Sequence, residues 1–367
     1  MRLVQFLGGL ALAAAPGLAL AQSPPASGTL HFYNWSDYID PQTIPAFEAE
    51  TGIKVVMDVY DSNETLEAKL LAGNSGYDLV VPTSTYFQRQ LGAEVYLPLD
   101  KSKLPNLANM DPDLMASVAQ ADPDNAHGVI YLWGTNGIAY NPAKVAERMG
   151  PDFTLDSWAA VFDPAVASKL ADCGITMLDS ASEMIPLVLN YLGLPPGSTE
   201  SADLEKAAET LAAVRPYIRY FNSSQYLSDL ANGEICVAVS FSGDAFIAAD
   251  RAAAAGAGVE VEYAVPKEGA MEWFDVLAIP SDAPNPDAAH AFIDYLMRPD
   301  VIAPITDYVS YPNANKAATD LVDAEIRENP AIYPTPEVMA RLFPEPVPDA
   351  RGERALTRLW TRARTGQ

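Results

Sequence analysis

Short apolar segments alternate with longer amphipathic stretches along most of this 367-residue chain. The apolar segments have the length and the β-branched or aromatic content of strands, which are predicted at 30–33, 54–59, 79–81, 129–132, 175–178, 235–240, 259–265 and 274–279. Helices are predicted between and after them, at 40–52, 61–73, 155–161, 183–191, 204–214, 225–232, 244–255, 286–297, 299–309 and 354–364. Strands that alternate with helices in this way predict an α/β fold with a mostly parallel sheet.

The first 21 residues differ from the rest, because they carry one charge, at Arg2, and then an apolar run that ends in Ala19-Leu20-Ala21. A basic start, a short apolar region and an A-x-A-like end are typical of a secretory signal peptide, cleaved here after about Ala21. No cysteine stands at that site to carry a lipid anchor, and no other segment has the run of about 18 apolar residues that a spanning helix needs. The sequence therefore predicts a soluble product exported to the periplasm.

About 346 residues follow the signal peptide, which exceeds one typical domain and predicts two lobes. The α/β pattern is interrupted near 135–140 and again near 258–263, so the chain is expected to cross between the lobes more than once and to form a hinge. The first lobe is predicted from 22–134 with about 259–310, and the second from 135–258 with about 311–367.

The chain is strongly acidic, with 48 Asp and Glu residues against 23 Lys and Arg. Loss of the signal peptide removes Arg2 alone and leaves 22 basic residues, a formal net charge of −26. Such a protein repels nucleic acid and anionic membranes and attracts cations, so no nucleic-acid partner is expected. The alternative, that acidity only keeps an exported protein soluble, stays open on charge alone.

Cys173 and Cys236 are the only two cysteines, and both lie in the part of the chain that is predicted to be exported. An oxidising compartment favours a disulfide over a metal site for such a pair. Each cysteine lies beside a predicted strand, so neighbouring strands could bring the two together. Two buried free thiols are the alternative.

Aromatic and acidic residues occur together where predicted strands end. The first strand runs into Tyr33-Asn34-Trp35-Ser36-Asp37-Tyr38, and the same combination returns at Phe241 with Asp244 and at Trp273-Phe274-Asp275. Ligands of open α/β sheets bind at the ends of the strands. Aromatic faces and carboxylates together suit an organic cation with an apolar chain. The alternatives are a place in the core for each ring and a solvated surface position for each carboxylate.

The sequence is poor in catalytic machinery. Its three histidines stand in no zinc-binding spacing, and it has no nucleophile elbow, P-loop or complete dinucleotide fingerprint. No cofactor and no metal are expected, and the chain is not expected to be an enzyme. The competing hypothesis is an exported hydrolase that uses paired carboxylates on a carbohydrate. The carboxylates that stand at strand ends or helix starts are Asp37, Glu183, Asp244 and Asp275.

Six motifs spread over the chain form a more specific pattern. They are His31-Phe-Tyr-Asn-Trp-Ser-Asp-Tyr-Ile39, Tyr60-Asp-Ser-Asn-Glu64, Gly76-Tyr-Asp-Leu-Val-Val-Pro82, Asn232-Gly-Glu-Ile-Cys-Val-Ala238, Pro266-Lys-Glu-Gly-Ala-Met271 and Asn313-Ala-Asn-Lys-Ala-Ala318. Together they resemble the periplasmic putrescine/spermidine-binding proteins of bacterial ABC importers, from about residue 28 to the C-terminus. The resemblance implies two lobes joined by a hinge that close over one linear polyamine, and an inner-membrane ABC permease as partner of a monomer. A carrier for a sensor or chemoreceptor would use the same pocket.

The resemblance also implies a ligand site built from both lobes. The matching positions are Trp35, Ser36, Asp37, Tyr38, Thr83, Glu183, Phe241, Asp244, Trp273, Asp275 and Tyr311. Thr83 takes the place of a hydroxyl that is usually Ser. Phe241 stands where many relatives carry Trp, which loses an N–H donor and part of the attraction for a cation. A disulfide between Cys173 and Cys236 is implied as well.

Two positions bear on which polyamine is preferred. Trp273 stands where putrescine-preferring relatives carry Phe, and Glu345, in Phe343-Pro-Glu-Pro346, adds a carboxylate near the edge of the predicted cleft. Spermidine has a third ammonium that Glu345 could pair with, so spermidine is expected to bind more tightly than putrescine. The alternative is that Glu345 lies exposed in a Pro-rich loop, where a charge pair contributes about 0–1 kcal/mol.

Overall fold

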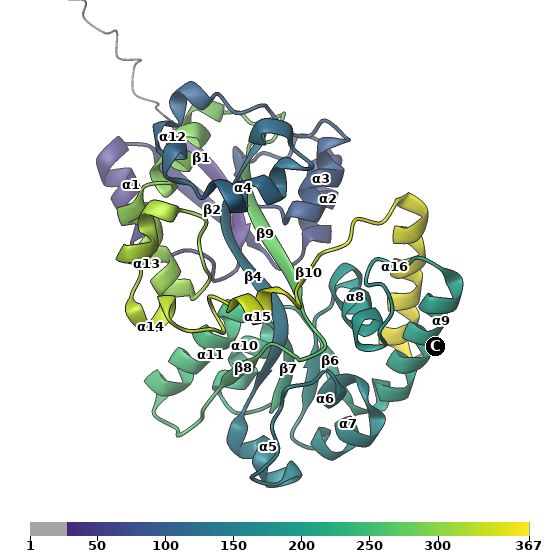
Figure 1. The fold of residues 1–367 in the computed structure, drawn as a ribbon. Helices are drawn as coiled ribbons and strands as arrows, with labels where there is room; N and C mark the ends of the chain where they lie inside the picture. The colour runs from purple at the N-terminus through teal and green to yellow at the C-terminus, as the bar shows by residue number, and fades with distance from the viewer. Residues whose placement is uncertain (1–27, 367) are drawn as a thin grey trace, which may run out of the picture.

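The computed structural model describes residues 28–366, and they fold into two α/β lobes that lie one above the other in Figure 1. The predicted signal peptide and its cleavage site lie outside the described residues. Two strands, β4 and β9, run from one lobe toward the other through the middle of the molecule (Figure 1). None of the helices within residues 28–366 combines the length and the apolar character needed to cross a membrane.

The strands of the described chain share one mixed sheet. They are β1 (Thr29–Trp35), β2 (Lys54–Tyr60), β3 (Leu79–Val80), β4 (Gly128–Tyr140), β5 (Ile175–Met177), β6 (Ile218–Phe221), β7 (Val237–Phe241), β8 (Glu262–Ala264), β9 (Met271–Ala278) and β10 (Phe343–Pro344). Their order is β2-β1-β3-β9-β4-β7-β5-β6, with β10 beside β9 and β8 beside β4. Pairing is parallel among β1, β2 and β3 and among β5, β6 and β7, as predicted, but β4 runs antiparallel to β7, β8 and β9.

Helices cover both faces of this sheet. They are α1 (Thr43–Thr51), α2 (Asn63–Leu71), α3 (Ser84–Leu91), α4 (Pro112–Ala119), α5 (Pro142–Met149), α6 (Ala159–Phe162), α7 (Pro164–Leu170), α8 (Ala181–Tyr191), α9 (Ser201–Val214), α10 (Gln225–Ala231), α11 (Ser242–Ala255), α12 (Pro286–Leu296), α13 (Pro299–Val309), α14 (Ala324–Arg327), α15 (Pro336–Met339) and α16 (Ala350–Thr365). The predicted helices are present with shifted ends, whereas α3, α4, α5, α7, α14 and α15 were not predicted.

Strand β4 is much longer than the four residues that the sequence predicted. Its first half pairs with β9 and its second half with β7, so one strand belongs to the sheet of both lobes. The segment from Gly134 to Gly137 has a polar sequence, so the strand was not predicted to continue through it. Every residue of that segment is nevertheless buried. A Cβ atom at Gly134 would lie 2.8 Å from the ring of Trp273, and one at Gly137 would lie 2.4 Å from the hydroxyl of Tyr263. Glycine is therefore required where other side chains press against the crossing strand.

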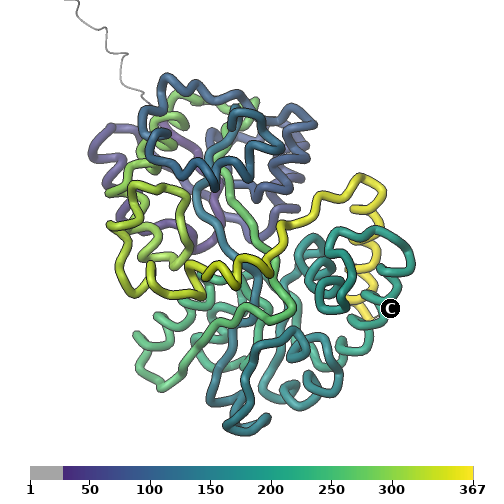
Figure 2. Tube along the Cα trace, viewed as in Figure 1, coloured from purple at the N-terminus to yellow at the C-terminus, as the bar shows by residue number. Residues whose placement is uncertain are grey.

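The C-terminal part of the chain returns through both lobes (Figure 2). The segment 311–342 lies against the first lobe, where Asn313 pairs with Leu132 of β4 and the 3-10 helix Lys316–Leu321 packs on α13. The yellow end of the chain then passes to the second lobe, where α16 packs on α8 and α9. We therefore propose the lobe division predicted from sequence with one change, in which 311–342 moves from the second lobe to the first.

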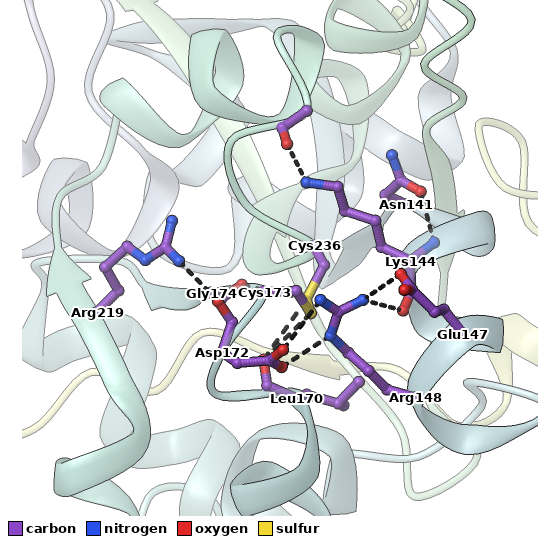
Figure 3. A network of polar contacts seen from close by, with 11 residues as sticks. Asn141, Lys144, Glu147, Arg148, Leu170, Asp172, Cys173, Gly174, Arg219 and Cys236 are labelled. Atoms are coloured by element: carbon purple, nitrogen blue, oxygen red, sulfur yellow. Dashed lines mark hydrogen bonds and ion pairs between the residues drawn. A yellow bond between two sulfur atoms is a disulfide. The ribbon is translucent and has the colours of Figure 1, made fainter.

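Cys173 and Cys236 form a disulfide, with their Cα atoms 5.4 Å apart, which confirms the predicted bond and rules out the free-thiol alternative. Cys173 follows α7 and Cys236 precedes β7, so the bond closes a loop inside the second lobe (Figure 3). The guanidinium of Arg148 pairs with the carboxylate of Asp172 beside it at 2.7 Å. The disulfide thus cross-links the second lobe next to β7, a strand that leads to the cavity described next.

Candidate ligand-binding cavity between the lobes

A cavity of about 630 Å³ opens where the two lobes meet. All twelve residues predicted for the site line it: Trp35, Ser36, Asp37, Tyr38, Thr83, Glu183, Phe241, Asp244, Trp273, Asp275, Tyr311 and Glu345. The structure thus brings together residues that are more than 300 positions apart in sequence, and their contact with a ligand stays a prediction.

Five lining residues were missed by the sequence prediction, namely Tyr60, Asp61, Ser223, Ser224 and Leu227. Tyr60 is the last residue of β2 and Asp61 follows it, so the strand-end signal that singled out Trp35 and Asp37 could have found them. Ser223 follows β6, which the sequence did not predict as a strand, and no comparable signal marks it.

The cavity lies at the carboxyl ends of the parallel strands, where open α/β sheets bind ligands. β1 ends at Trp35, β2 at Tyr60 and β7 at Phe241, and each strand leads directly into the cavity wall. The chain turns sharply after β1, where Asp37 has a φ of +55°. Aspartate is one of the few residues apart from glycine that adopts this left-handed conformation readily. The crossing strand β9 supplies the floor with Trp273 and Asp275.

Aromatic rings form a continuous wall. The ring of Trp273 lies edge-on to Phe241 with centroids 5.9 Å apart, and its centroid is 5.5 Å from that of Tyr311. Tyr311 in turn meets Tyr38 edge-on at 5.1 Å. On the other side, the indole N–H of Trp35 donates to the backbone oxygen of Val81 at 2.9 Å, which fixes that ring. The wall is therefore held in place before any ligand arrives.

Asp244 lies in the first turn of α11 and accepts hydrogen bonds from two tyrosine hydroxyls, Tyr226 at 2.6 Å and Tyr311 at 2.7 Å. The backbone N–H of Asp244 donates to the Tyr311 oxygen at 3.1 Å, so this pair is locked in both directions. Burial raises the pKa of Asp244 to about 6, against the two tyrosine hydrogen bonds, which lower it. The carboxylate is thus oriented by neutral donors and keeps its charge available.

Asp275 is 3% exposed and accepts a hydrogen bond from the hydroxyl of Thr83 at 2.7 Å. Thr83 is held in turn by Asn63, whose amide nitrogen donates to the Thr83 hydroxyl at 2.9 Å and whose oxygen accepts from the Thr83 N–H at 3.1 Å. Burial raises the pKa of Asp275 to about 7. Threonine at position 83 therefore positions this carboxylate.

Glu345 is 6% exposed and accepts a hydrogen bond from the hydroxyl of Thr85, so the alternative that it lies exposed in a Pro-rich loop is wrong. Pairing of β10 with β9 carries it into the cavity. Burial raises its pKa to about 8. Burial, together with the negative charge of Glu345, also raises the pKa of Glu183 well above its usual value. The amide of Asn136 donates to Glu183 at 3.4 Å.

Asp37 differs from the other four predicted carboxylates because its side chain is 49% exposed and already paired. Arg251 of α11 donates to it at 2.8 Å, so this ion pair joins the two lobes at the mouth of the cavity. Within the described residues, no Lys, Arg or His lies within 4.0 Å of a carboxylate oxygen of Glu183, Asp244, Asp275 or Glu345. The interior of the cavity thus holds acidic groups without a basic partner.

Uncompensated buried carboxylates favour a ligand that brings positive charge, since an unpaired buried ion is costly. Within residues 28–366 no cluster of three or more His, Cys, Asp or Glu side chains is arranged to hold a metal ion. Rings that flank the carboxylates can contact methylene groups and attract an ammonium by about 0.5–2 kcal/mol each. The arrangement therefore fits an organic cation with several charges along an apolar chain.

Comparison with known proteins gives a consistent result. A family model described as bacterial extracellular solute-binding protein matches residues 42–335. The putrescine-binding periplasmic protein PotF of Escherichia coli is 51% identical over 99% of this chain and 98% of its own length. The putrescine-binding periplasmic protein SpuD of Pseudomonas aeruginosa is 50% identical over 98% of each chain. The spermidine/putrescine-binding periplasmic protein of Salmonella typhimurium is 34% identical over 90% of this chain and 91% of its own.

A solved structure agrees with these sequence matches. The putative spermidine/putrescine ABC transporter protein of Listeria monocytogenes superposes with a TM-score of 0.82 at 34% identity, covering 92% of this chain and 99% of its own. The two-lobe fold predicted from sequence is therefore confirmed.

Proposed function

Because this chain belongs to the bacterial extracellular solute-binding proteins, we propose that it is the periplasmic polyamine-binding component of an ABC importer. The observation that carries the proposal is that four carboxylates, Glu183, Asp244, Asp275 and Glu345, share one aromatic-walled cavity without a basic partner, two of them (Asp275 and Glu345) being buried. The names of the relatives above support the ligand class, and their place in ABC importers supports a membrane permease as partner.

The ammonium groups and methylenes of a polyamine match the carboxylates and aromatic rings of the cavity. A protonated polyamine alternates ammonium groups with methylenes, so it needs acceptors at intervals and apolar surface between them. Asp244 on α11 and Asp275 on β9 line the cavity together with Trp273, whose ring can cover the methylenes of the ligand. Closure of the lobes would desolvate these groups and strengthen the charge pairs. The ligand thus links the two lobes.

The hydrolase alternative gains no support, because the relatives named above are binding proteins of transporters. In the proposal the chain binds its ligand unchanged, acts as a monomer and is not an enzyme. A carrier for a sensor would use the same cavity, and the binding experiment below applies to it equally.

Polyamine binding is expected to raise the melting temperature, because the ligand binds the folded form only. Putrescine and spermidine at a hundred times their dissociation constant should stabilise the protein by about 2.7 kcal/mol, or roughly 4 °C for a chain of this size. A thermal-shift screen measures this, with glutamate and maltose as controls that should have no effect. Stabilisation by the acid or the sugar alone would contradict the proposal.

The relatives with 50% and 51% identity are named for putrescine alone, which weighs against the preference for spermidine that the sequence suggested. The 34% relative is named for both polyamines. We propose that the cavity accepts both and that Glu345 sets their ratio, since it is buried in the cavity and could pair with a third ammonium.

Replacing Glu345 with Gln should therefore weaken spermidine binding more than putrescine binding. The ratio of the two dissociation constants is expected to change by roughly five- to a hundredfold, which corresponds to about 1–3 kcal/mol. Calorimetry of the parent and of Glu345→Gln with each polyamine measures the ratio. Glu272→Gln is the matched control, because Glu272 lies on the adjacent strand β9 outside the cavity lining. An unchanged ratio would remove Glu345 from this role.

A further inference from the structure

Helix α16 reverses the charge of the rest of the chain. Its sixteen residues contain five arginines and one glutamate, in a protein that has 48 acidic against 23 basic residues. The helix lies at the periphery of the second lobe, beside α9 (Figure 1). None of the residues of α16 lines the cavity between the lobes, so its arginines are not part of the proposed ligand site.

Four of these arginines form one stripe. Arg351, Arg354, Arg358 and Arg362 follow one another at intervals of three or four residues, so they lie on one side of the helix, and all four are exposed. The opposite side is buried against α8 and α9 through Leu356, Leu359 and Trp360. With a rise of about 1.5 Å per residue, this arginine stripe is roughly 16 Å long.

The arginine stripe has no partner within the described chain. None of its four guanidinium groups makes a hydrogen bond, an ion pair or a ring contact with residues 28–366. The remaining charges of α16 are paired, because Arg364 binds Asp179 at 2.6 Å and Glu353 binds Arg89. Most other arginines of the chain are likewise paired, as Arg298 is with Glu50 at 3.0 Å. The stripe is therefore an exception in this protein.

Fold stability does not account for the stripe. Like charges three or four residues apart on a helix repel one another and destabilise it. Of the four arginines of the stripe, only Arg362 lies in the last turn of α16, where a positive charge is favoured by the helix dipole. A shallow groove between α9 and α16 adjoins the stripe, and its charged lining residues are Arg215, Arg362 and Glu209.

We propose that the arginine stripe is a docking surface for an acidic protein surface, and, resting on the proposed function, that this surface belongs to the membrane permease. The guanidinium fork pairs with carboxylates through two parallel hydrogen bonds, which favours arginine over lysine for such contacts. Charges are screened beyond about 8 Å at physiological salt, so an acidic partner is attracted by the stripe locally while the acidic remainder repels it. The stripe thereby selects the face that docks.

An anionic membrane is the less favourable partner. The apolar side of α16 is packed against the protein, so the helix has no apolar surface left to insert between lipids. The net charge of the chain also opposes adsorption of the whole protein on an anionic bilayer.

The test measures docking of fluorescently labelled protein to spheroplasts of the source bacterium, with and without its polyamine permease. The double variant Arg354→Glu/Arg358→Glu is expected to need at least tenfold more protein for half-saturation, and docking of the parent should weaken as salt is raised. The matched control is Lys169→Glu/Lys206→Glu, which reverses two exposed charges of the same lobe and should change half-saturation less than twofold. Melting temperature confirms that all variants fold.

Calorimetry with putrescine separates the two proposals, because neither pair of substitutions touches the cavity and both should bind as the parent does. A parent that docks but binds no polyamine would contradict the proposed function and leave the docking surface standing. Equal docking of the parent and the arginine variant would overturn the inference. The inference would also be overturned if the arginine variant lost binding to the same extent on spheroplasts that lack the permease, or on phosphatidylglycerol vesicles. Either result would assign the stripe to lipid.

Discussion

Replacing Asp244 or Asp275 with asparagine should weaken putrescine binding by roughly thirtyfold to a few thousandfold. Each substitution keeps the shape of the side chain but removes a buried charge that would face an ammonium, a change that typically costs about 2–5 kcal/mol. The surroundings cannot supply another anion easily, since Asp244 is held by Tyr226 and Tyr311 and Asp275 by Thr83, all of them neutral. Isothermal titration calorimetry with putrescine measures the loss.

The matched control is Asp250→Asn, which makes the same change at an exposed position of the same helix as Asp244. Its affinity for putrescine should stay within twofold of the parent. The ligand-free variants at 244 and 275 should be at least as stable as the parent, because each loses an unpaired buried charge. Unchanged affinity in both variants would exclude these carboxylates from the site.

Lowering the pH from 8 to 5 should weaken polyamine binding by at least a hundredfold. In the unliganded protein the pKa values of Asp244, Asp275 and Glu345 are raised to about 6, about 7 and about 8. The ligand amines stay protonated throughout this range, as a lysine amine with a pKa of about 10.4 does. Protons and the ammonium groups then compete for the same carboxylates, so affinity falls about tenfold per pH unit below each pKa.

The same competition predicts that spermidine binding at pH 7 releases roughly one to two protons. Calorimetry at pH 7 in buffers that differ in their ionisation enthalpy measures the number. The variant Asp275→Asn should release fewer protons and should have a shallower pH dependence than the parent. Affinity that stays constant from pH 5 to 8, with no proton released, would show that these carboxylates do not face the ligand.

The stability of the ligand-free protein should depend on pH in the opposite direction. The folded-state pKa values of Asp275 and Glu345 lie above their ordinary values, so the folded state binds these protons more tightly than the unfolded state does. Their contribution to the free energy of unfolding is greatest below the ordinary carboxyl pKa, and it is lost as the pH rises through about 7 to 8. Bound ligand should offset this loss of stability, because its ammonium groups pair with the ionised carboxylates.

Strand ends could be located from sequence, and this signal pointed to the aromatic and acidic members of the site such as Trp35 and Asp275, whereas Thr83 and Tyr311 were identified only through the family resemblance. An apolar run such as the one before Trp35 ends where polar and aromatic residues begin, and that local signal is enough to place the residue at the edge of a sheet. A strand without such an apolar run cannot be recognised in this way. Only Ile218 of β6 is buried and Arg219 is exposed, so the short apolar pattern is broken and neither the strand nor Ser223 after it was recognised.

Burial of individual charges could not be predicted, because it depends on pairing between distant segments. Glu345 follows Phe343-Pro344 in a Pro-rich stretch whose composition is typical of a surface loop. Only the parallel pairing of Phe343 with Met271 carries it into the cavity. The helix predicted at 61–73 begins later than expected, at Asn63, because Ser62 accepts the capping hydrogen bond from the Thr65 N–H at 3.3 Å.

The crossing strand β4 has a consequence for how the molecule unfolds. Gly128–Tyr140 completes the sheet of the first lobe through β9 and that of the second through β7. Removing it from either partner exposes the buried edge of the other, so the loss of one lobe withdraws a central strand from its neighbour. We therefore expect the two lobes to unfold together, as one cooperative unit.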